Sequence, residues 1–110
     1  LKAYASEDWL IEVLRRLMSL RDGTFVDVGV NLGQTLLKVA AIDPARDYLG
    51  FEPNPTCVAY LGRLIAANGL SQCRVLPVGL SSGTGILRLS VYGNDADSSA
   101  SLVPGFRPGK

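Results

Sequence analysis

The sequence predicts an α/β domain in which parallel strands alternate with helices. Short apolar runs rich in β-branched or aromatic residues alternate along the chain with segments of helical periodicity. The connections between them are short, as in right-handed βαβ units. With 110 residues, 47% of them hydrophobic, the chain suits one small domain with a buried core. We expect half of a Rossmann-like domain: an N-terminal helix within residues 1–23, a βαβαβ core over 24–80, and an extra strand and irregular tail over 81–110.

The first helix is expected over residues 6–20. Glu12 and Arg16 are four residues apart and can form an ion pair on its outer side. The dipeptide at 22–23, Asp-Gly, ends the helix. The apolar residues at helical spacing form one stripe that should face the core: Leu10, Val13, Leu14 and Leu17.

A strand is expected over residues 24–30 (TFVDVGV). Its apolar residues do not alternate with polar ones, so both faces should be buried, as in a parallel sheet. A helix over 33–42 and a strand over 48–52 follow.

The next helix has clear signals at both ends. Asn54 can cap its first turn, Pro55 suits its first position, and the dipeptide at 68–69, Asn-Gly, is a good stop. A third parallel strand is expected over 73–80. Leu87, Leu89 and Val91 then alternate with polar residues, which indicates a half-buried antiparallel strand.

The composition excludes several function classes. Eleven basic and ten acidic residues give a net charge of +1 without a basic block, so no nucleic-acid footprint is expected. No apolar run approaches the ~20 residues that span a bilayer. The chain has no His, which removes His-based nucleophile systems and His-ligated metals from this segment, and no metal site is expected. Cys57 and Cys73 are expected as buried thiols in a reducing compartment, the cytoplasm. The chain begins at Leu1, and we expect it to be part of a longer protein.

The informative stretch is the turn that follows the first strand. Ligands of open α/β sheets bind beyond the carboxyl ends of the strands. Gly29 and Gly33 would allow a tight turn and a close approach of ligand to backbone, and Asp27 would lie at the mouth of the crevice. The alternative is a structural turn with an incidental aspartate.

A second acidic residue follows the second strand. Glu52 lies 52 − 33 = 19 positions after Gly33. An acidic residue about 20 positions beyond the glycine turn is placed to accept two hydrogen bonds from a ribose diol. The alternative is that Glu52 only caps or solvates the end of the strand.

The spacing of the turn discriminates between nucleoside ligands. The dinucleotide fingerprint G-x-G-x-x-G would need glycine at Asn31 and Gln34, so it fails. The spacing D-x-G-x-x-x-G of Asp27, Gly29 and Gly33 instead resembles the loop of class I methyltransferases, which implies S-adenosylmethionine as the ligand. That cofactor has no pyrophosphate but carries an ammonium and a sulfonium that suit a carboxylate.

Three stretches resemble the FkbM-type methyltransferases: residues 25–34 (FVDVGVNLGQ), 51–55 (FEPNP) and 78–85 (VGLSSGTG). Asn31 matches the asparagine of that family's turn, and Val30 departs from its usual small residue. The resemblance covers about residues 24–102 and implies a partial class I methyltransferase fold. It implies transfer of a methyl group from S-adenosylmethionine, most often to oxygen of a small molecule, sugar or lipid-linked glycan.

The resemblance assigns cofactor contacts but no catalytic base. The residues it marks for S-adenosylmethionine are Asp27, Gly29, Asn31, Gly33 and Glu52. A complete class I fold has about seven strands, so this segment alone is expected to lack activity and to self-associate through an unpaired sheet edge. Two alternatives stay open: a fragment of an NAD(P)-dependent oxidoreductase, and a non-catalytic Rossmann-like interaction module.

Overall fold

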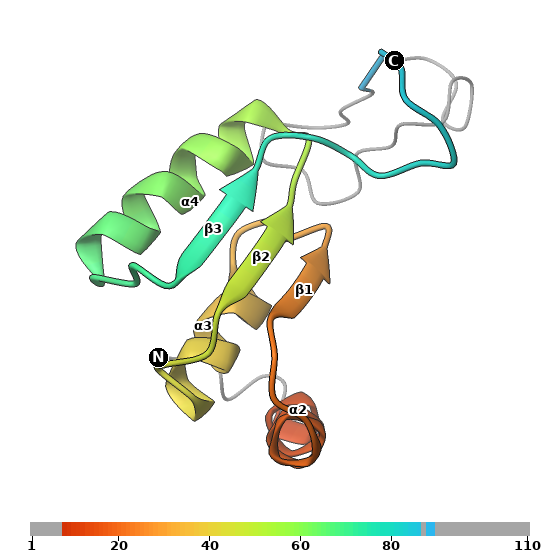
Figure 1. The fold of residues 1–110 in the computed structure, drawn as a ribbon. Helices are drawn as coiled ribbons and strands as arrows, with labels where there is room; N and C mark the ends of the chain where they lie inside the picture. The colour runs from red at the N-terminus through yellow and green to blue at the C-terminus, as the bar shows by residue number, and fades with distance from the viewer. Residues whose placement is uncertain (1–7, 87, 90–110) are drawn as a thin grey trace.

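The computed structural model describes residues 8–86, 88 and 89, and these form the expected alternation of helices and strands (Figure 1). The strands form one parallel sheet in the order β1-β2-β3. The α/β class and the alternation of elements from the first helix to the third strand are therefore confirmed. In chain order, the elements are α2 (Asp8–Leu20), β1 (Phe25–Val28), α3 (Gln34–Ile42), β2 (Tyr48–Phe51), α4 (Pro55–Ala67) and β3 (Cys73–Leu76).

The register of the sheet aligns the carboxyl ends of its strands. Phe25 lies opposite Tyr48, and Asp27 lies opposite Gly50. Beyond the last pair, the amide of Gly29 donates to Phe51 O over 2.8 Å. The amide of Glu52 in turn donates to Leu76 O over 3.0 Å on β3. The turns that leave β1 and β2 therefore start side by side at one edge of the sheet.

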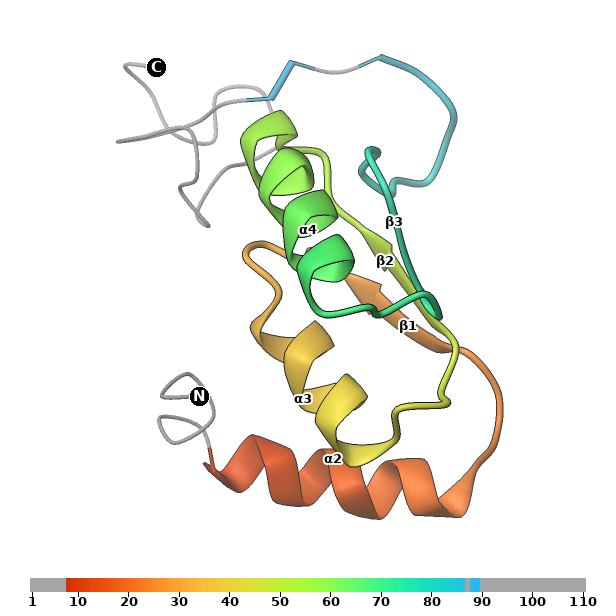
Figure 2. The ribbon, with the colours of Figure 1, turned by 90° about the vertical axis from the view of Figure 1, so that its left-hand side faces the viewer.

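The core lies between the sheet and the helices on one of its faces. Figure 2 shows α3 and α4 on the same side of the strands, with α2 crossing below α3. Side chains from helices, strands and the first turn meet in this layer and exclude water, which stabilises the fold by burial of apolar surface. The buried members of the core are Leu14, Met18, Val30, Leu36, Val39, Tyr48, Leu61 and Cys73.

The other face of the sheet is uncovered by the described residues. Val26 and Val28 on β1 are 54% and 63% exposed, and Leu76 on β3 is 44% exposed. The expectation that both faces of the first strand are buried is therefore wrong for this part of the chain. Side chains alternate between the two faces of a strand, and helices cover only the face that carries Phe25 and Asp27.

Local signals place the ends of α4 where the sequence predicts them. The Asn54 side chain accepts a hydrogen bond from the amide of Thr56 over 3.0 Å, and Pro55 is the first residue of the helix. Asn68 is the C-terminal cap, and Gly69 after it has a φ of +61°. None of the described helices is both long enough and apolar enough to cross a membrane.

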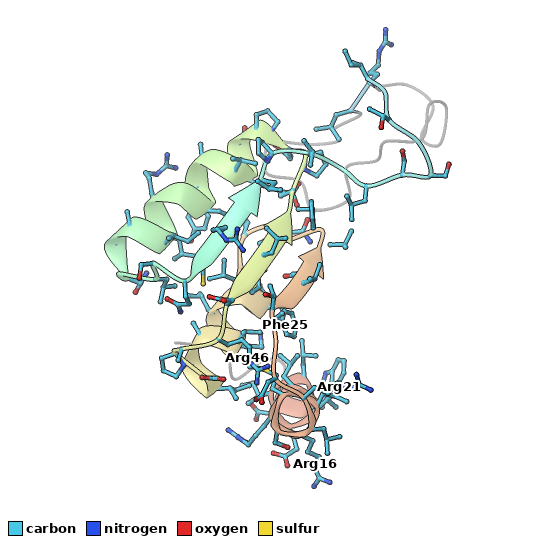
Figure 3. All side chains as sticks on the ribbon, in the orientation of Figure 1. Arg16, Arg21, Phe25 and Arg46 are labelled. Atoms are coloured by element: carbon cyan, nitrogen blue, oxygen red, sulfur yellow. The ribbon has the colours of Figure 1, made fainter. Side chains whose placement is uncertain are left out.

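Arg46 joins α2 to the rest of the molecule. Its guanidinium donates to the carbonyl oxygens of Met18, Arg21 and Gly23, and its Nε lies 3.2 Å from Asp43 Oδ2 (Figure 3). The last carbonyls of a helix lack partners within the helix. One arginine therefore holds the end of α2 against the α3–β2 connection.

Two expectations from the sequence differ from the structure in detail, and a third is not tested by it. The third strand ends at Leu76 and not at residue 80, because Pro77 has no amide hydrogen for the sheet. On α2, Leu14 is buried but Val13 and Leu17 of the expected stripe are exposed, since the core meets a neighbouring face that includes Met18. The antiparallel strand expected over 87–91 lies mostly outside the described residues.

Candidate functional site

The turn between β1 and α3 bends through three residues with left-handed backbone. Gly29, Asn31 and Gly33 have φ values of +82°, +56° and +87°. Glycine adopts this conformation without penalty, and asparagine is among the few other residues that tolerate it. The amide of Gly33 closes the turn with a 3.1 Å bond to Val30 O. The backbone conformation explains why these residue types stand in this order.

Glu52 ties this turn to the next one. Its side chain is only 4% exposed. Oε1 accepts a hydrogen bond from the backbone N–H of Asn31 over 2.8 Å, and Oε2 accepts one from the backbone N–H of Asn54 over 2.9 Å. A carboxylate has about four lone-pair positions, so each oxygen retains capacity for a further donor. Glu52 is thus a structural brace between the two turns, which the sequence did not predict.

Asp27 faces the helix-covered side of the sheet at the end of β1. Its Oδ2 accepts a hydrogen bond from the Tyr48 hydroxyl over 2.5 Å. Burial raises the pKa of the Asp27 carboxyl, the bond from Tyr48 opposes that rise, and the negative charge of Glu52 adds to it. Two carboxylates therefore lie beside the turn, and no cation of residues 8–86, 88 or 89 forms an ion pair with either of them.

The two glycines of the turn differ in their surroundings. A Cβ at Gly33 would lie 2.9 Å from a methyl of Leu61 and 2.9 Å from a methyl of Leu64. The φ of Gly33 favours glycine, and a larger residue there would also have to displace leucine methyls of α4. A Cβ at Gly29 would meet nothing within 4 Å. Space for a ligand beside the backbone is open at Gly29.

Asn54 carries a donor without an acceptor. Its side chain is 2% exposed, and its Nδ2 makes no hydrogen bond. Buried polar groups are normally paired, so such a donor beside the candidate site calls for an explanation. Cys57 nearby is a buried free thiol whose pKa is raised by burial and by the charge of Glu52, which argues against a nucleophilic role.

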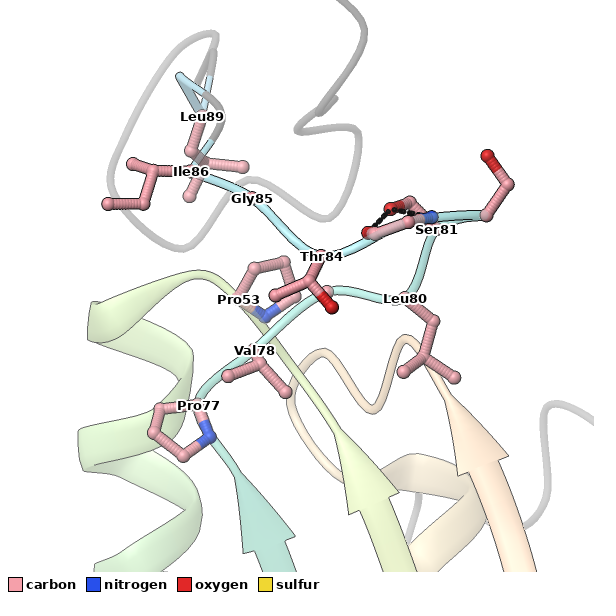
Figure 4. Close-up of a pocket in the computed structure, with 12 residues that line it drawn as sticks. Pro53, Pro77, Val78, Leu80, Ser81, Thr84, Gly85, Ile86 and Leu89 are labelled. Atoms are coloured by element: carbon pink, nitrogen blue, oxygen red, sulfur yellow. Dashed lines mark hydrogen bonds between the residues drawn. The ribbon is translucent and has the colours of Figure 1, made fainter.

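A cavity of about 640 Å³ lies beyond the carboxyl ends of β2 and β3 (Figure 4). The volume falls in the range of about 300–1,000 Å³ typical of small-molecule sites. One of the residues that line the cavity is Pro53, which directly follows Glu52 in the sequence. The other lining residues belong to the chain after β3: Pro77, Val78, Gly79, Leu80, Ser81, Ser82, Gly83, Thr84, Gly85, Ile86 and Leu89.

The structure brings the five sequence-predicted residues to one edge of the sheet. Asn31 is bonded to Glu52, whereas Asp27 is bonded to Tyr48, which the sequence analysis did not single out. Alternation along β2 places residues 48 and 50 on one face, and this signal could have drawn attention to Tyr48. In the described residues, no group of three or more His, Cys, Asp or Glu side chains is arranged to hold a metal ion.

Comparisons with known proteins relate the chain to methyltransferases. It is 39% identical over 80 residues to the methyltransferase sdnD of Sordaria araneosa, and the match covers 72% of this chain and 30% of that protein. A solved structure from Staphylococcus aureus, assigned as a caffeoyl-CoA O-methyltransferase, superposes with a TM-score of 0.56 at 17% identity. That match covers 62% of this chain and 34% of the other chain. No family model matches the sequence.

These comparisons establish the fold and show how much of each matched protein the chain covers. The chain has the Rossmann-like architecture of a class I methyltransferase, as the sequence predicts, and is similar in sequence to a methyltransferase. It spans 30% of the length of sdnD and 34% of the Staphylococcus aureus chain.

Proposed function

We propose that the chain is the cofactor-binding part of an S-adenosylmethionine-dependent methyltransferase of the FkbM type. The observation that carries the proposal is the bond between the Asn31 amide and Glu52 Oε1. It joins the glycine turn to the ribose-binding candidate at the one edge of the sheet where such folds bind ligands. The similarity to sdnD over 72% of the chain supports the same reading.

The site has the charge and space for this cofactor. Asp27 would pair with the ammonium of the methionine part, and the open space beside Gly29 would admit that part against the backbone. Asn31 and Gly33 shape the turn. The free lone pairs of Glu52 would accept from the ribose hydroxyls, and the unused Asn54 donor lies in the same connection and could donate to one of them. When bound, the cofactor supplies an electrophilic methyl group on its sulfonium.

The proposed acceptor is an oxygen nucleophile of a small molecule, sugar or glycolipid, as the resemblance implies. No residue of the described part is assigned as a catalytic base. Methyl transfer gains much of its rate from alignment of the reacting groups, so the contribution of this chain would be to hold and orient the cofactor. Its buried thiols suit a reducing compartment, and we place the enzyme in the cytoplasm.

The two alternatives make different demands on the site. A dinucleotide would bring a pyrophosphate to the turn, where the negative charges of Asp27 and Glu52 would repel it. A non-catalytic module would need no ligand, so it predicts that neither cofactor binds.

Saturation-transfer NMR on the purified chain separates these three functions. We expect transfer to the protons of S-adenosylhomocysteine and none to NAD. Transfer to NAD alone would assign the chain to the oxidoreductases, and transfer to neither ligand would favour the non-catalytic module.

A further inference from the structure

Tyr48 is a buried phenol on β2 that lies directly against the proposed cofactor site. Its side chain has no exposed surface, and its ring stacks on Phe25 with 5.9 Å between centroids and 5° between planes. Its hydroxyl donates to Asp27 Oδ2. A buried hydroxyl needs a partner, and here the partner is a carboxylate at the end of the neighbouring strand.

Gly50 makes the space for this contact. It lies opposite Asp27 in the sheet, on the same face as Tyr48. A Cβ at Gly50 would lie 3.1 Å from Tyr48 Cε1 and 3.4 Å from the Tyr48 hydroxyl, and it would overlap Val30 Cγ2. The phenol therefore lies along the sheet between Phe25 and the bare backbone of Gly50, and its hydroxyl has a fixed place.

We propose that Tyr48 is a positioning residue of the cofactor site, whose hydroxyl fixes Asp27 for the ammonium of the cofactor. The inference rests on the proposed function. Oδ2 of Asp27 is committed to Tyr48, whereas Oδ1 accepts no hydrogen bond from the described residues. Oδ1 is thus the oxygen left for a ligand, on a carboxylate that cannot rotate without losing its bond.

The hydroxyl also determines the charge of Asp27. Within the described residues, the titratable groups that act on Asp27 are the Tyr48 hydroxyl and the Glu52 carboxylate, and only the hydroxyl lowers the pKa of Asp27. Burial, followed by the bond to Asp27, raises the pKa of Tyr48 itself, so it remains a donor at neutral pH. Phenylalanine at position 48 would keep the apolar packing but remove the hydroxyl, whose hydrogen bond favours the ionised form of Asp27.

The test compares Tyr48→Phe with Tyr60→Phe, a matched loss of a hydroxyl from an exposed tyrosine of α4. Carbon-13 NMR of the Asp27 carboxyl gives its titration midpoint without any ligand. We expect the midpoint to move to higher pH in Tyr48→Phe and to stay unchanged in Tyr60→Phe. Calorimetry with S-adenosylhomocysteine should show a roughly 2- to 10-fold weaker affinity at pH 7 for Tyr48→Phe alone. The loss of affinity on acidification should also begin at higher pH.

Each outcome decides a separate point. An unchanged Asp27 midpoint in Tyr48→Phe would overturn the positioning role, whatever happens to binding. A shifted midpoint with unchanged affinity would restrict Tyr48 to a structural role and also overturn the proposal. A shifted midpoint in a chain that binds no S-adenosylhomocysteine at all would instead overturn the proposed function. If Tyr48→Phe does not fold, 3-fluorotyrosine at position 48, a stronger donor of nearly the same shape, should move the midpoint to lower pH.

Discussion

The two faces of the sheet are built from similar residues but differ in what covers them. On the helix-covered face, Tyr48 is fully buried and holds Asp27, and α4 places Leu61 against the turn at Gly33. On the other face, Val26 and Val28 are exposed on the same strand that carries Asp27. Apolar side chains stabilise a fold only where water is removed from them. We therefore expect the covered face to contribute most of the stability and to hold the site, and the open face to mediate association.

The largest expected effect comes from matched leucine truncations on the two faces. Leu61→Ala removes a side chain with no exposure from α4, and we expect a loss of about 2–5 kcal/mol in the free energy of unfolding. Leu76→Ala on β3 alters a side chain that is already partly exposed, so its loss should stay below about 1 kcal/mol. Urea denaturation followed by circular dichroism measures both. Equal losses would contradict the distinction between the faces.

Glu52→Ala should lower the free energy of unfolding by a similar or slightly smaller amount than Leu61→Ala. The substitution leaves the backbone N–H groups of Asn31 and Asn54 without their acceptor, so we expect the free energy of unfolding to fall by roughly 2–4 kcal/mol. The control is Glu12→Ala, which removes an exposed carboxylate paired with Arg15 and Arg16 and should leave the free energy of unfolding nearly unchanged. If the two variants unfold at the same urea concentration, Glu52 does not brace the turns.

The open face of the sheet, together with the unpaired edge of β1, should mediate association between copies of the chain. Within the described residues β1 pairs only with β2, so its other edge and the exposed Val28 are available. We expect concentration-dependent sedimentation of the chain, reduced by Val28→Lys and unaffected by Val13→Lys on α2. If the chain were a monomer at all concentrations, or if Val13→Lys alone reduced association, the open face and the edge of β1 would not be the contact.

A smaller effect is expected in the pH dependence of stability. The folded-state pKa of Asp27 is raised, chiefly by burial, so the folded chain binds more protons than the unfolded chain between the two pKa values. The contribution of Asp27 to stability is thus present below the unfolded pKa and is lost as the pH rises through the folded pKa. Relative to Asp27→Asn, the wild type should lose free energy of unfolding from pH 3 to pH 7. The same slope in both proteins would be the contrary result.

The comparison of the faces also shows what the sequence could predict. Signals that act within a few residues were sufficient for the helix ends: Asn54 and Pro55 begin α4, and Gly69 follows its last turn. Local spacing was likewise sufficient to find Gly29 as part of a turn. The open face was not predictable, because apolar residues such as Val28 look the same whether or not another layer covers them.

Contacts between strands were beyond the reach of local signals for another reason. The bond between Tyr48 and Asp27 depends on the register of two strands, and the bond between Asn31 and Glu52 depends on how two turns meet. Neither follows from spacing along the chain. The sequence therefore predicted Asp27 and Glu52 as residues of the candidate site but not the groups that hold them.

The central claim is that the turn at Gly29 holds the cofactor, and calorimetry of S-adenosylhomocysteine binding to two glycine variants tests it most directly. Gly29 and Gly69 both have positive φ, and a Cβ on either would meet nothing within 4 Å. Alanine therefore imposes a similar backbone strain, of about 1–2 kcal/mol, at both positions. We predict that Gly29→Ala weakens binding about tenfold or more while Gly69→Ala binds as the wild type does. Equal affinities for the two variants would contradict the account.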